Sequence, residues 1–356
     1  MKLKHLIDFC DIPQDDFEEM YKLGCDIMEN PEKYSSACSG KILATLFYEP
    51  STRTQLSFQT AMLRLGGSVI GFSDPNSSSV KKGESLRDTI KVISSYADVT
   101  VIRNPVEGAA YAASLYSSIP VINAGDGGHL HPTQTLTDIF TLRNLKGTCD
   151  GLNIGFCGDL LNGRTVHSLI SALLRYKNNK LWLISTPELS VPDYIAKRLD
   201  AVGIEYHVVN TLEECIGELD MLYMTRIQRE RFASEEDYRR QSGVYVLTPD
   251  KMKLAKDDMI ILHPLPKVDE IGPEVDDDPR AKYFEQAQNG LYIRMALILT
   301  MCKNHPKGKE QSFVYDPPIE HFCHNPKCIT NYEKYLPPIK KKVGDSDTCV
   351  YCDHTL

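Results

Sequence analysis

Residues 41–67 read KILATLFYEPSTRTQLSFQTAMLRLGG, and this stretch decides the class of fold. Its first part, Lys41–Phe47, is a short apolar run bounded by polar residues, as is typical of a buried strand. The part that follows carries Phe58, Met62 and Leu65 at the spacing of one helix face, and a pair of glycines ends it. A strand joined directly to a helix is the beginning of the unit from which parallel sheets are built.

Strand-like and helix-like segments alternate over the first 300 residues. Further strands are predicted at Val99–Arg103, Pro120–Ala124, Leu152–Asp159, Leu181–Ser185, Glu205–Val209, Asp220–Thr225 and Met259–His263. Further helices are predicted at Gln134–Leu145, Arg164–Tyr176 and Tyr283–Met301. This alternation predicts an α/β fold with two doubly wound parallel-sheet domains joined by right-handed crossovers. We place them at residues 1–148, closed by the helix 283–303, and at residues 149–282, with the boundary near Lys146–Asp150.

Length and composition agree with two medium-sized domains and a small addition. The chain has 356 residues, of which 42% are hydrophobic, and its formal net charge is −8. An acidic protein is poorly suited to bind nucleic acid over a general surface. The N-terminal MKLKHLIDFC has no signal-peptide core, and no stretch approaches the ~18 apolar residues of a membrane span. We therefore expect a cytosolic protein with reduced cysteines.

Four residues after the first strand form a candidate anion site. Ser51, Thr52, Arg53 and Thr54 lie where the strand gives way to the helix. A helix N-terminus offers unpaired N–H groups and the positive end of the helix dipole, and these residues add hydroxyl donors and a forked cation. The alternative is a capped helix with a surface arginine. The position at a strand end favours a phosphate site, because ligands of open α/β sheets bind there.

Four cysteines near the end of the chain have metal-ligand spacing. Cys323-x4-Cys328 is followed after 20 residues by Cys349-x2-Cys352. Two such pairs can bring four thiolates into the tetrahedron of a structural zinc site. Disulfides or a redox pair are alternatives that a cytosolic setting disfavours. Nearby histidines could replace one cysteine: His321, His324 and His354. Composition also changes after Asn304, so residues 304–356 are predicted to be a linker and a small zinc-binding C-terminal domain.

The sequence resembles a known enzyme family along most of its length. The stretch FYEPSTRTQLSFQTAMLRLGGSVIGF is similar to the carbamoyl-phosphate signature of the aspartate and ornithine carbamoyltransferases. The resemblance continues through SSSVKKGESLRDT, VIRNP, NAGDGGHLHPTQTLTD, GDLLNGRTVHSL, YMTRIQRER and LHPLPKVDE, in family order across residues 40–300. It implies transfer of the carbamoyl group of carbamoyl phosphate to an amine. Such a reaction needs cations and neutral donors, and no metal or covalent nucleophile.

The resemblance assigns roles to residues of the first domain. Arg103 is a second cation near the phosphate and the carbonyl oxygen, although alone it would pass for a surface arginine. His131 donates to the carbonyl oxygen, and Gln134 accepts from the carbamoyl NH2. The phosphate contacts fall on Ser51, Thr52, Arg53 and Thr54.

The second domain carries the residues assigned to the amino-acid substrate. Arg164 and Arg226 follow strands and suit two carboxylates, because each guanidinium can grip one with two hydrogen bonds. The alternatives are a solvated charge at a helix start for Arg164 and an ion pair with Glu230 for Arg226. Gln228 is assigned to the same substrate. Backbone carbonyls that accept from the attacking amine come from Leu265 and Pro266.

A polar loop, Ser73–Glu84, is implied to reach the active site of a neighbouring subunit. Its contacts are assigned to Ser78 and Lys82, with Ser79 as an alternative to Ser78 because the local spacing departs slightly from the family pattern. Sites shared in this way imply a homotrimer or a multiple of trimers. By composition alone the segment is a surface loop.

The choice between aspartate and ornithine rests on two features. Arg226 would face the side-chain ammonium of ornithine, and two like charges at close range are costly when desolvated. The sequence has His263-Pro264 where the ornithine enzymes show a cysteine after the histidine. We therefore expect L-aspartate as the acceptor and N-carbamoyl-L-aspartate as the product, a step of de novo pyrimidine biosynthesis. His263 itself is predicted to be structural.

The tail from about Phe313 resembles the zinc domain of the regulatory chain that partners some aspartate carbamoyltransferases. The nucleotide-binding domain that precedes it in that family has no room here, so the resemblance does not extend to nucleotide control, and we expect the module to be a covalent stabilising strap. A zinc ribbon on an inactive scaffold is the rival reading. Weak RNA binding would draw on the basic and aromatic residues of the tail, namely Lys340, Lys341, Lys342, Tyr332, Tyr335 and Tyr351.

Overall fold

The computed structural model describes residues 4–74, 79–227, 232, 234–241, 243–304, 323–344 and 346–356. The chain divides into two compact units. Unit 1 comprises Met1–Thr133 and Leu291–Leu356, and unit 2 comprises Gln134–Gly290. Two helices, α5 (Pro132–Lys146) and α10 (Tyr283–Asn304), each have residues in both units.

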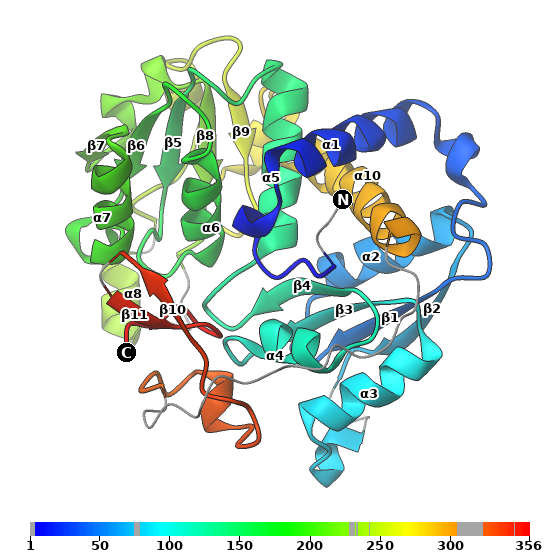
Figure 1. Cartoon of the computed structure of the whole chain (residues 1–356). Helices are drawn as coiled ribbons and strands as arrows, with labels where there is room; N and C mark the ends of the chain where they lie inside the picture. Colours follow the sequence, from blue (N-terminus) through cyan, green and yellow to red (C-terminus); the bar gives the residue numbers. More distant parts are fainter. Residues whose placement is uncertain are drawn as a thin grey trace. The chain divides into compact units, whose positions relative to one another are not determined.

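Unit 1 is built on a parallel sheet with the strand order β2-β1-β3-β4 (Figure 1). Its strands are β1 (Ile42–Phe47), β2 (Ser68–Phe72), β3 (Val99–Asn104) and β4 (Val121–Asp126). Its helices are α1 (Gln14–Glu29), α2 (Thr52–Arg64), α3 (Leu86–Tyr96) and α4 (Ala109–Tyr116). Helices α3 and α4 cover one face of the sheet, and α2 and α10 cover the other. The chain thus winds in one direction from β1 to β2 and in the other through β3 and β4.

The unit that the sequence stretch 41–67 predicts is present. Strand β1 is buried along almost its whole length, and α2 buries Phe58 and Met62. The glycine pair ends the helix for a steric reason. Gly66 has a φ of +80°, and a Cβ placed there would lie 2.4 Å from the carbonyl oxygen of Ser35. Only glycine fits this turn.

Unit 2 contains a five-stranded parallel sheet with the order β7-β6-β5-β8-β9. Its strands are β5 (Asn153–Cys157), β6 (Lys180–Ile184), β7 (Glu205–Val209), β8 (Met221–Met224) and β9 (Ile260–Leu262). The helices that lie wholly in this unit are α6 (Arg164–Leu173), α7 (Asp193–Val202), α8 (Glu235–Gln241) and α9 (Pro249–Met252). One buried cluster, which includes Trp182, Leu222 and Tyr283, forms much of its core.

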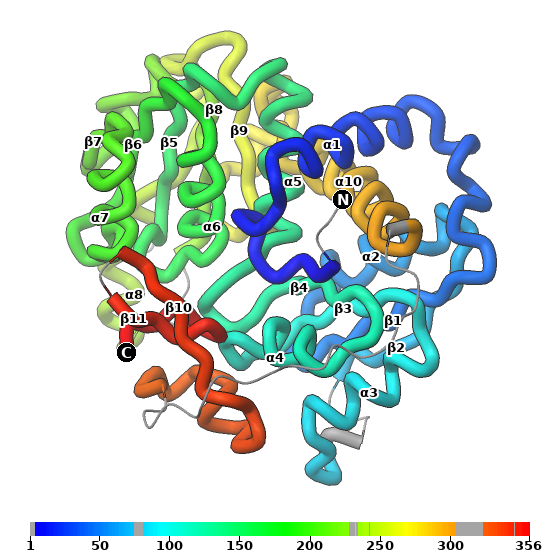
Figure 2. Tube along the Cα trace, viewed as in Figure 1, coloured from blue at the N-terminus to red at the C-terminus, as the bar shows by residue number. Residues whose placement is uncertain are grey.

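The described end of the chain, residues 323–344 and 346–356, is a small module within unit 1, which we call the C-terminal module. It contains the antiparallel hairpin β10 (Lys340–Val343) and β11 (Ser346–Cys349). Figure 2 traces this hairpin at the red end of the chain. Its buried residues, including Cys328 and Tyr351, belong to the same hydrophobic cluster as Leu86 of α3 and Ala109 of α4.

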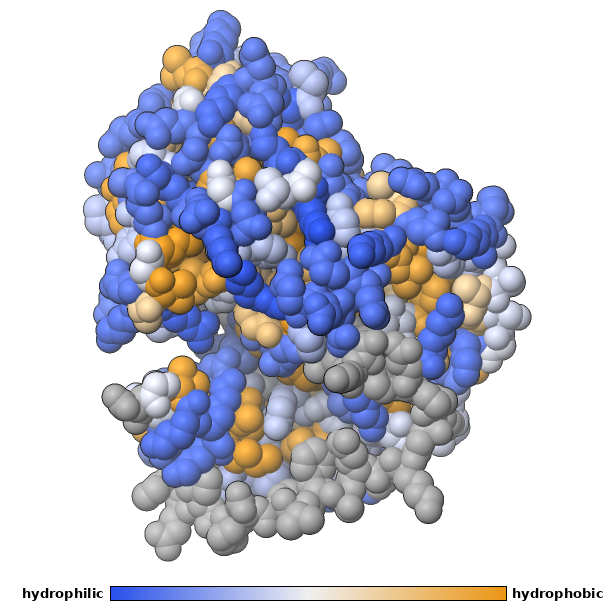
Figure 3. Space-filling view, turned by 45° about the horizontal axis from the view of Figure 1, so that its top comes forward, coloured by the Kyte–Doolittle hydropathy of each residue, from blue (hydrophilic) through white to orange (hydrophobic). Residues whose placement is uncertain are grey.

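The observed architecture confirms the predicted fold class. Every strand predicted from the sequence is present within a few residues of its predicted ends, and β2, β10 and β11 are additional strands. None of the helices in the described part of the chain is both long and apolar enough to cross a membrane. The face drawn in Figure 3 is mostly hydrophilic, with hydrophobic side chains in small groups.

Candidate active site

The predicted phosphate-binding residues lie at the carboxyl end of β1. Ser51 occupies the N-cap position of α2, but its side chain makes no capping hydrogen bond. The Ser51 hydroxyl and the N–H groups of the first turn therefore do not hydrogen-bond to each other. Both can instead donate to an anion at the helix N-terminus. Thr54 is buried in the first turn, whereas Arg53 is exposed and forms no ion pair within the described ranges.

Arg103 ends the neighbouring strand β3 and is paired in register with Phe47 of β1. Its side chain is buried, and its guanidinium lies 3.4 Å from Glu49 Oε2 and donates to the carbonyl oxygen of Ala124 at 3.3 Å. Nη1 also lies 3.4 Å from Nε2 of His131. The structure therefore brings together Arg103 and His131, which the sequence separates by 28 positions.

These residues flank the point where the winding of the first sheet changes direction. The chain passes from β1 outward to β2 and then returns to β3 on the other side of β1. Such a switch point leaves room at the carboxyl ends of the two central strands, where ligands of doubly wound sheets bind. Arg53 follows one of these strands and Arg103 ends the other.

The loop assigned to a neighbouring subunit is only partly described. Ser78 lies outside the described residues, as does the side chain of Ser79. Lys82 ends a short 3-10 helix (Ser79–Lys82), is exposed, and makes no ion pair with any described residue.

Gln134 is oriented by a buried carboxylate in unit 2. Its Nε2 donates to Oδ1 of Asp138 at 2.7 Å, and Asp138 also accepts from Gln286 at 2.6 Å and from the hydroxyl of Tyr223 at 2.9 Å. Burial and the neighbouring carboxylate raise the pKa of Tyr223 well above its ordinary value, so its hydroxyl stays a donor. With its NH2 group engaged, Gln134 presents its oxygen as the group that can accept from a ligand.

Arg164 and Arg226 flank the switch point of the second sheet. Arg164 opens α6 after β5, and Arg226 follows β8, the strand paired with β5 on the side away from β6. Both side chains are half-buried. The two strands approach closely here: Gly158 has a φ of +119°, and a Cβ there would lie 2.3 Å from the carbonyl oxygen of Thr225. Gln228 lies outside the described residues.

A histidine holds the loop that precedes Arg164. Nε2 of His167 donates to the carbonyl oxygen of Leu160 at 2.7 Å, and Nδ1 lies 2.8 Å from the hydroxyl of Tyr194. Burial lowers the pKa of His167, so the ring is neutral near pH 7. Oδ1 of Asp159 accepts a hydrogen bond from the backbone N–H of Asn162 at 2.9 Å and so fixes the same loop.

The turn after β9 carries Leu265 and Pro266, joined by a cis peptide bond. Nδ1 of His263 accepts from the N–H of Leu265 at 2.7 Å, and Nε2 lies 2.6 Å from Glu270. Glu270 also accepts from the N–H groups of Val268 and Asp269, each at 3.1 Å. Burial alone would raise the pKa of Glu270, but its bonds to His263 and the backbone lower it. One hydrogen-bonded couple, His263 and Glu270, thus organises this turn.

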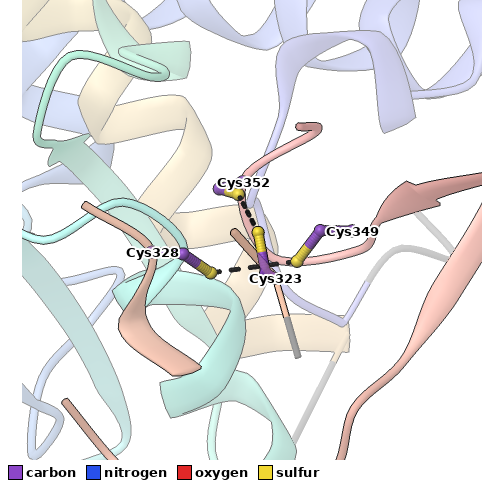
Figure 4. A group of neighbouring side chains, drawn as sticks. All are labelled: Cys323, Cys328, Cys349 and Cys352. Carbon is purple, nitrogen blue, oxygen red and sulfur yellow. Dashed lines mark hydrogen bonds between the residues drawn. The ribbon is translucent and has the colours of Figure 1, made fainter. Parts of the chain in front are cut away.

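The four predicted metal ligands gather in one place. Figure 4 shows the sulfurs of Cys323, Cys328, Cys349 and Cys352 turned toward one another, and all lie within 4.8 Å of each other. Two of the Sγ–Sγ distances are 3.6 and 3.8 Å. A disulfide would require ~2.05 Å, whereas thiolates at ~2.3 Å from one tetrahedral metal ion lie ~3.8 Å apart. The residues therefore fit a metal ion.

The histidine alternatives at this cluster are wrong for the described residues, because His324 and His354 are exposed and outside the cluster. His321 lies outside the described residues. Several of the tail residues considered for RNA binding have partners within the protein. Tyr351 is buried against Tyr111, and the three tail lysines pair with carboxylates, namely Lys340 and Lys342 with Asp347 and Lys341 with Asp353.

One buried cation near the site is absent from the sequence-based prediction. Arg294 of α10 donates to Oγ of Ser57 at 3.1 Å and to the carbonyl oxygen of Thr133 at 3.4 Å, and its guanidinium lies over the ring of Phe58. It ties α2 to the segment that follows His131. An arginine within an apolar helix was the only available signal.

Comparisons with known proteins agree with this arrangement. Residues 4–144 match the family model of the aspartate/ornithine carbamoyltransferase carbamoyl-P binding domain, and residues 150–301 match that of the Asp/Orn binding domain. The chain therefore belongs to the aspartate/ornithine carbamoyltransferase family. The second match ends at residue 301, before the C-terminal module.

The relatives narrow the family further. Aspartate carbamoyltransferase catalytic subunits of Clostridium perfringens and Clostridium acetobutylicum are 62% and 61% identical over 299 residues, covering 84% of this chain and 97% of each relative. The catalytic subunit of M. jannaschii aspartate transcarbamoylase has a TM-score of 0.80 at 46% identity, covering 85% of this chain and 99% of that one. Trypanosoma cruzi aspartate transcarbamoylase in complex with carbamoyl phosphate and aspartate has a TM-score of 0.78 at 35% identity, covering 83% and 95%.

Proposed function

We propose that the chain is an aspartate carbamoyltransferase, which transfers the carbamoyl group of carbamoyl phosphate to the α-amine of L-aspartate. The observation that carries this proposal is the placement of cations at both switch points. Arg53 and Arg103 flank that of one sheet, and Arg164 and Arg226 flank that of the other. Two substrates that both carry negative charge require such cations. The products are N-carbamoyl-L-aspartate and phosphate.

The groups assigned to carbamoyl phosphate belong to unit 1, except for Gln134, the first residue of unit 2. The phosphate is bound by Ser51, Thr52, Arg53 and Thr54 at the N-terminus of α2. Arg103 and His131, in contact at 3.4 Å, stabilise the negative charge that develops on the carbonyl oxygen as the amine attacks. Gln134 accepts from the carbamoyl NH2, because Asp138 holds its own NH2 group.

Unit 2 supplies the groups for the amino acid. Arg164, Arg226 and Gln228 bind the two carboxylates. The backbone carbonyls of Leu265 and Pro266 accept from the amine and direct its lone pair at the carbonyl carbon. The C–N bond forms first and gives a tetrahedral oxyanion; the C–O bond to phosphate then breaks, and the amine proton leaves with the phosphate. Catalysis in this scheme comes from positioning and charge stabilisation.

Arg226 and the His263-Pro264 sequence favour aspartate over ornithine. The decisive assay supplies carbamoyl phosphate with either amino acid and measures carbamoylaspartate and citrulline. We expect carbamoylaspartate alone. Citrulline formation at a comparable kcat/KM would contradict the assignment.

We further propose that the C-terminal cysteines bind a structural Zn²⁺ and that the module is related to the zinc domain of the regulatory chain. Four buried sulfurs leave no coordination position for a substrate, so the ion would supply folding energy and no chemistry. Metal analysis should give one zinc per chain. A fully folded, metal-free protein with an unchanged melting temperature would refute the structural role.

A shared active site, and with it a homotrimer, is our third proposal. It is supported by the exposure of Lys82 and the absence of an ion pair to it among described residues. Lys82→Ala and Arg53→Ala proteins should each be nearly inactive. Mixing them should restore part of the activity through hybrid oligomers. Failure to recover activity after verified subunit exchange would exclude sharing.

A further inference from the structure

The C-terminal module supplies two acceptors to the first turn of α3. Oε1 of Glu333 accepts from the N–H of Leu86 at 2.9 Å, and the hydroxyl of Tyr335 accepts from the N–H of Arg87 at 2.8 Å. The first four N–H groups of a helix have no partner within it. Here two of them are bound by residues almost 250 positions later in the chain. A carboxylate at this end also interacts favourably with the helix dipole.

Tyr335 is held in place on both sides. Its ring makes an edge contact with Tyr116 at a centroid distance of 5.6 Å, and the guanidinium of Arg87 lies 4.5 Å from its centroid. These contacts fix the hydroxyl at the helix end. The hydrogen bond to Arg87 N–H is therefore preorganised by packing and does not depend on an exposed, mobile side chain.

Helix α3 begins just after the segment that carries Lys82. Only residues 83–85 separate Lys82 from the first helical residue, Leu86. Within this connection, Oε2 of Glu84 accepts from the hydroxyl of Thr89 at 2.9 Å, and Ser85 caps the helix by accepting from the N–H of Asp88 at 3.1 Å. Hydrogen bonds thus connect the module to the first turn of α3, and the first turn of α3 to the residues next to Lys82.

The module also contacts the loop that follows Arg103. The N–H of Glu107 donates to the carbonyl oxygen of Lys327 at 3.0 Å, and the carbonyl of Glu107 accepts from Ile329 N–H at 2.9 Å. Oε2 of Glu107 accepts from Asn325 at 2.7 Å. These two backbone hydrogen bonds form an isolated bridge between Glu107 and Cys328, four residues beyond Arg103.

A third contact lies two residues before His131. The imidazole of His129 bridges Asp126, at 3.1 Å from Nδ1, and Asp353 of the module, at 3.2 Å from Nε2. The module therefore touches the chain beside each of the three segments of unit 1 that carry Lys82, Arg103 and His131.

We propose that Glu333 and Tyr335 are positioning residues for Lys82, acting through the first turn of α3. The catalytic part of this inference rests on the function proposed above, in which Lys82 contacts carbamoyl phosphate. When the two acceptors are removed, the first turn of α3 should open more often. The connection from Lys82 to α3 should then lose its fixed anchor at the start of the helix.

The test uses the full-length, metal-loaded protein and three variants: Tyr335→Phe, Glu333→Ala and the double variant. Tyr332→Phe is the matched control, because Tyr332 belongs to the same module and is 62% exposed. Brief trypsin treatment followed by mass spectrometry measures cleavage after Lys81 and Lys82. Cleavage of a transiently opened segment follows the population of its open form. Loss of one hydrogen bond should raise this rate about 5-fold, and loss of both by at least about 10-fold.

Kinetics give the second readout. The variants should raise KM for carbamoyl phosphate several-fold with little change in KM for aspartate, at unchanged metal content. Glu333→Gln should show little of the defect of Glu333→Ala, because its amide oxygen can still accept from Leu86 N–H. If the double variant loses its metal, the positioning role is judged from Tyr335→Phe alone, because this variant keeps the ring contacts with Tyr116 and Arg87 and removes only the hydroxyl.

Cleavage rates and KM values equal to those of Tyr332→Phe would overturn the inference. Failure of the proposed function looks different. Unchanged kinetics in Lys82→Ala would remove the catalytic role of Lys82 whatever the cleavage rates show. Impaired kinetics in Lys82→Ala, combined with normal cleavage in the module variants, would refute only the positioning role.

Discussion

Replacing His263 with phenylalanine tests whether the turn after β9 is held by a side chain that the reaction itself does not use. The imidazole is almost fully buried, with a side chain 1% exposed, and Glu270 is 5% exposed. Phenylalanine keeps the ring and removes both nitrogens. The N–H of Leu265 then loses its acceptor, and the Glu270 carboxylate loses one donor while keeping the N–H groups of Val268 and Asp269.

The structure sets the size of the effect. A buried group left without its hydrogen bond costs about 1–3 kcal/mol, and more when it is charged. The unpaired N–H of Leu265, together with the buried Glu270 carboxylate that loses one of its three donors, should lower the free energy of unfolding by about 3–5 kcal/mol, out of the ~5–15 kcal/mol of an ordinary domain. At about 2–4 °C per kcal/mol, the melting temperature should fall by about 6–20 °C. KM for aspartate should rise by about 10- to 100-fold, because small displacements of positioning groups are costly.

Two milder variants at the same position separate the two hydrogen bonds. His263→Asn places an oxygen near the position of Nδ1 and can still accept from Leu265 N–H. His263→Gln places an NH2 group near the position of Nε2 and can still donate to Glu270. We expect the asparagine variant to retain more of the aspartate kinetics and the glutamine variant to retain more of the thermal stability.

The assay combines thermal unfolding with steady-state kinetics for both substrates. His207→Phe is the control, because His207 also contacts a carboxylate, Glu205 at 3.1 Å, but on the surface. Its melting temperature and KM values should stay near those of the unchanged protein, since exposed pairs contribute little. If His263→Phe behaved like this control, the turn would be held by other contacts and the reasoning would fail.

Three further predictions concern other parts of the molecule. Arg226→Ala should lower kcat/KM for aspartate by about 10- to 150-fold, because each charged hydrogen bond contributes about 1.5–3 kcal/mol. Steady-state kinetics measure this loss, and replacement of the exposed Arg239 by alanine should leave kcat/KM unchanged. The lowered pKa of His167 means that the unfolded chain binds its proton more tightly than the folded protein, so the contribution of this residue is complete above about pH 6.5 and is lost as the pH falls below it. The melting temperature should therefore drop more steeply between pH 7.5 and 5.5 in the unchanged protein than in His167→Gln, and equal slopes would contradict the assignment. Gly108→Ala should destabilise the docked module by at least about 2 kcal/mol in thermal unfolding, because its φ is +83° and a Cβ would lie 2.6 Å from Cβ of Tyr351.

The sequence pattern located most of the framework because the buried strands contain runs of apolar residues. Strand β1 was predicted at 41–47 and lies at Ile42–Phe47. Strand β2 escaped prediction for a physical reason. It is a short edge strand with a largely exposed face, and it contains Gly71, where a Cβ would lie 2.0 Å from the carbonyl oxygen of Thr45. Nothing in SVIGF shows that its neighbour comes so close.

Family resemblance named the candidate cations, but it could not show what holds them. His263 was predicted to be structural, yet its Nδ1 binds the N–H of Leu265, one of the two residues assigned to the substrate amine. Likewise, the contact of Arg103 with His131 depends on the register of neighbouring strands. Such supporting bonds join residues whose spacing in the sequence carries no period, so only the folded chain reveals them.

The C-terminal module shows the same limit over a longer range. Its cysteine spacing is a local pattern and predicted the cluster correctly, because four ligands on two turns must meet to bind one ion. Its docking depends on Glu333 and Tyr335, which match no motif and become meaningful only beside the open N–H groups of α3. A helix start always needs such partners, and here they come from the module. The metal would therefore stabilise a surface whose most specific contacts lie next to Lys82, so loss of the ion should disturb the binding of carbamoyl phosphate before it disturbs the sheet beneath.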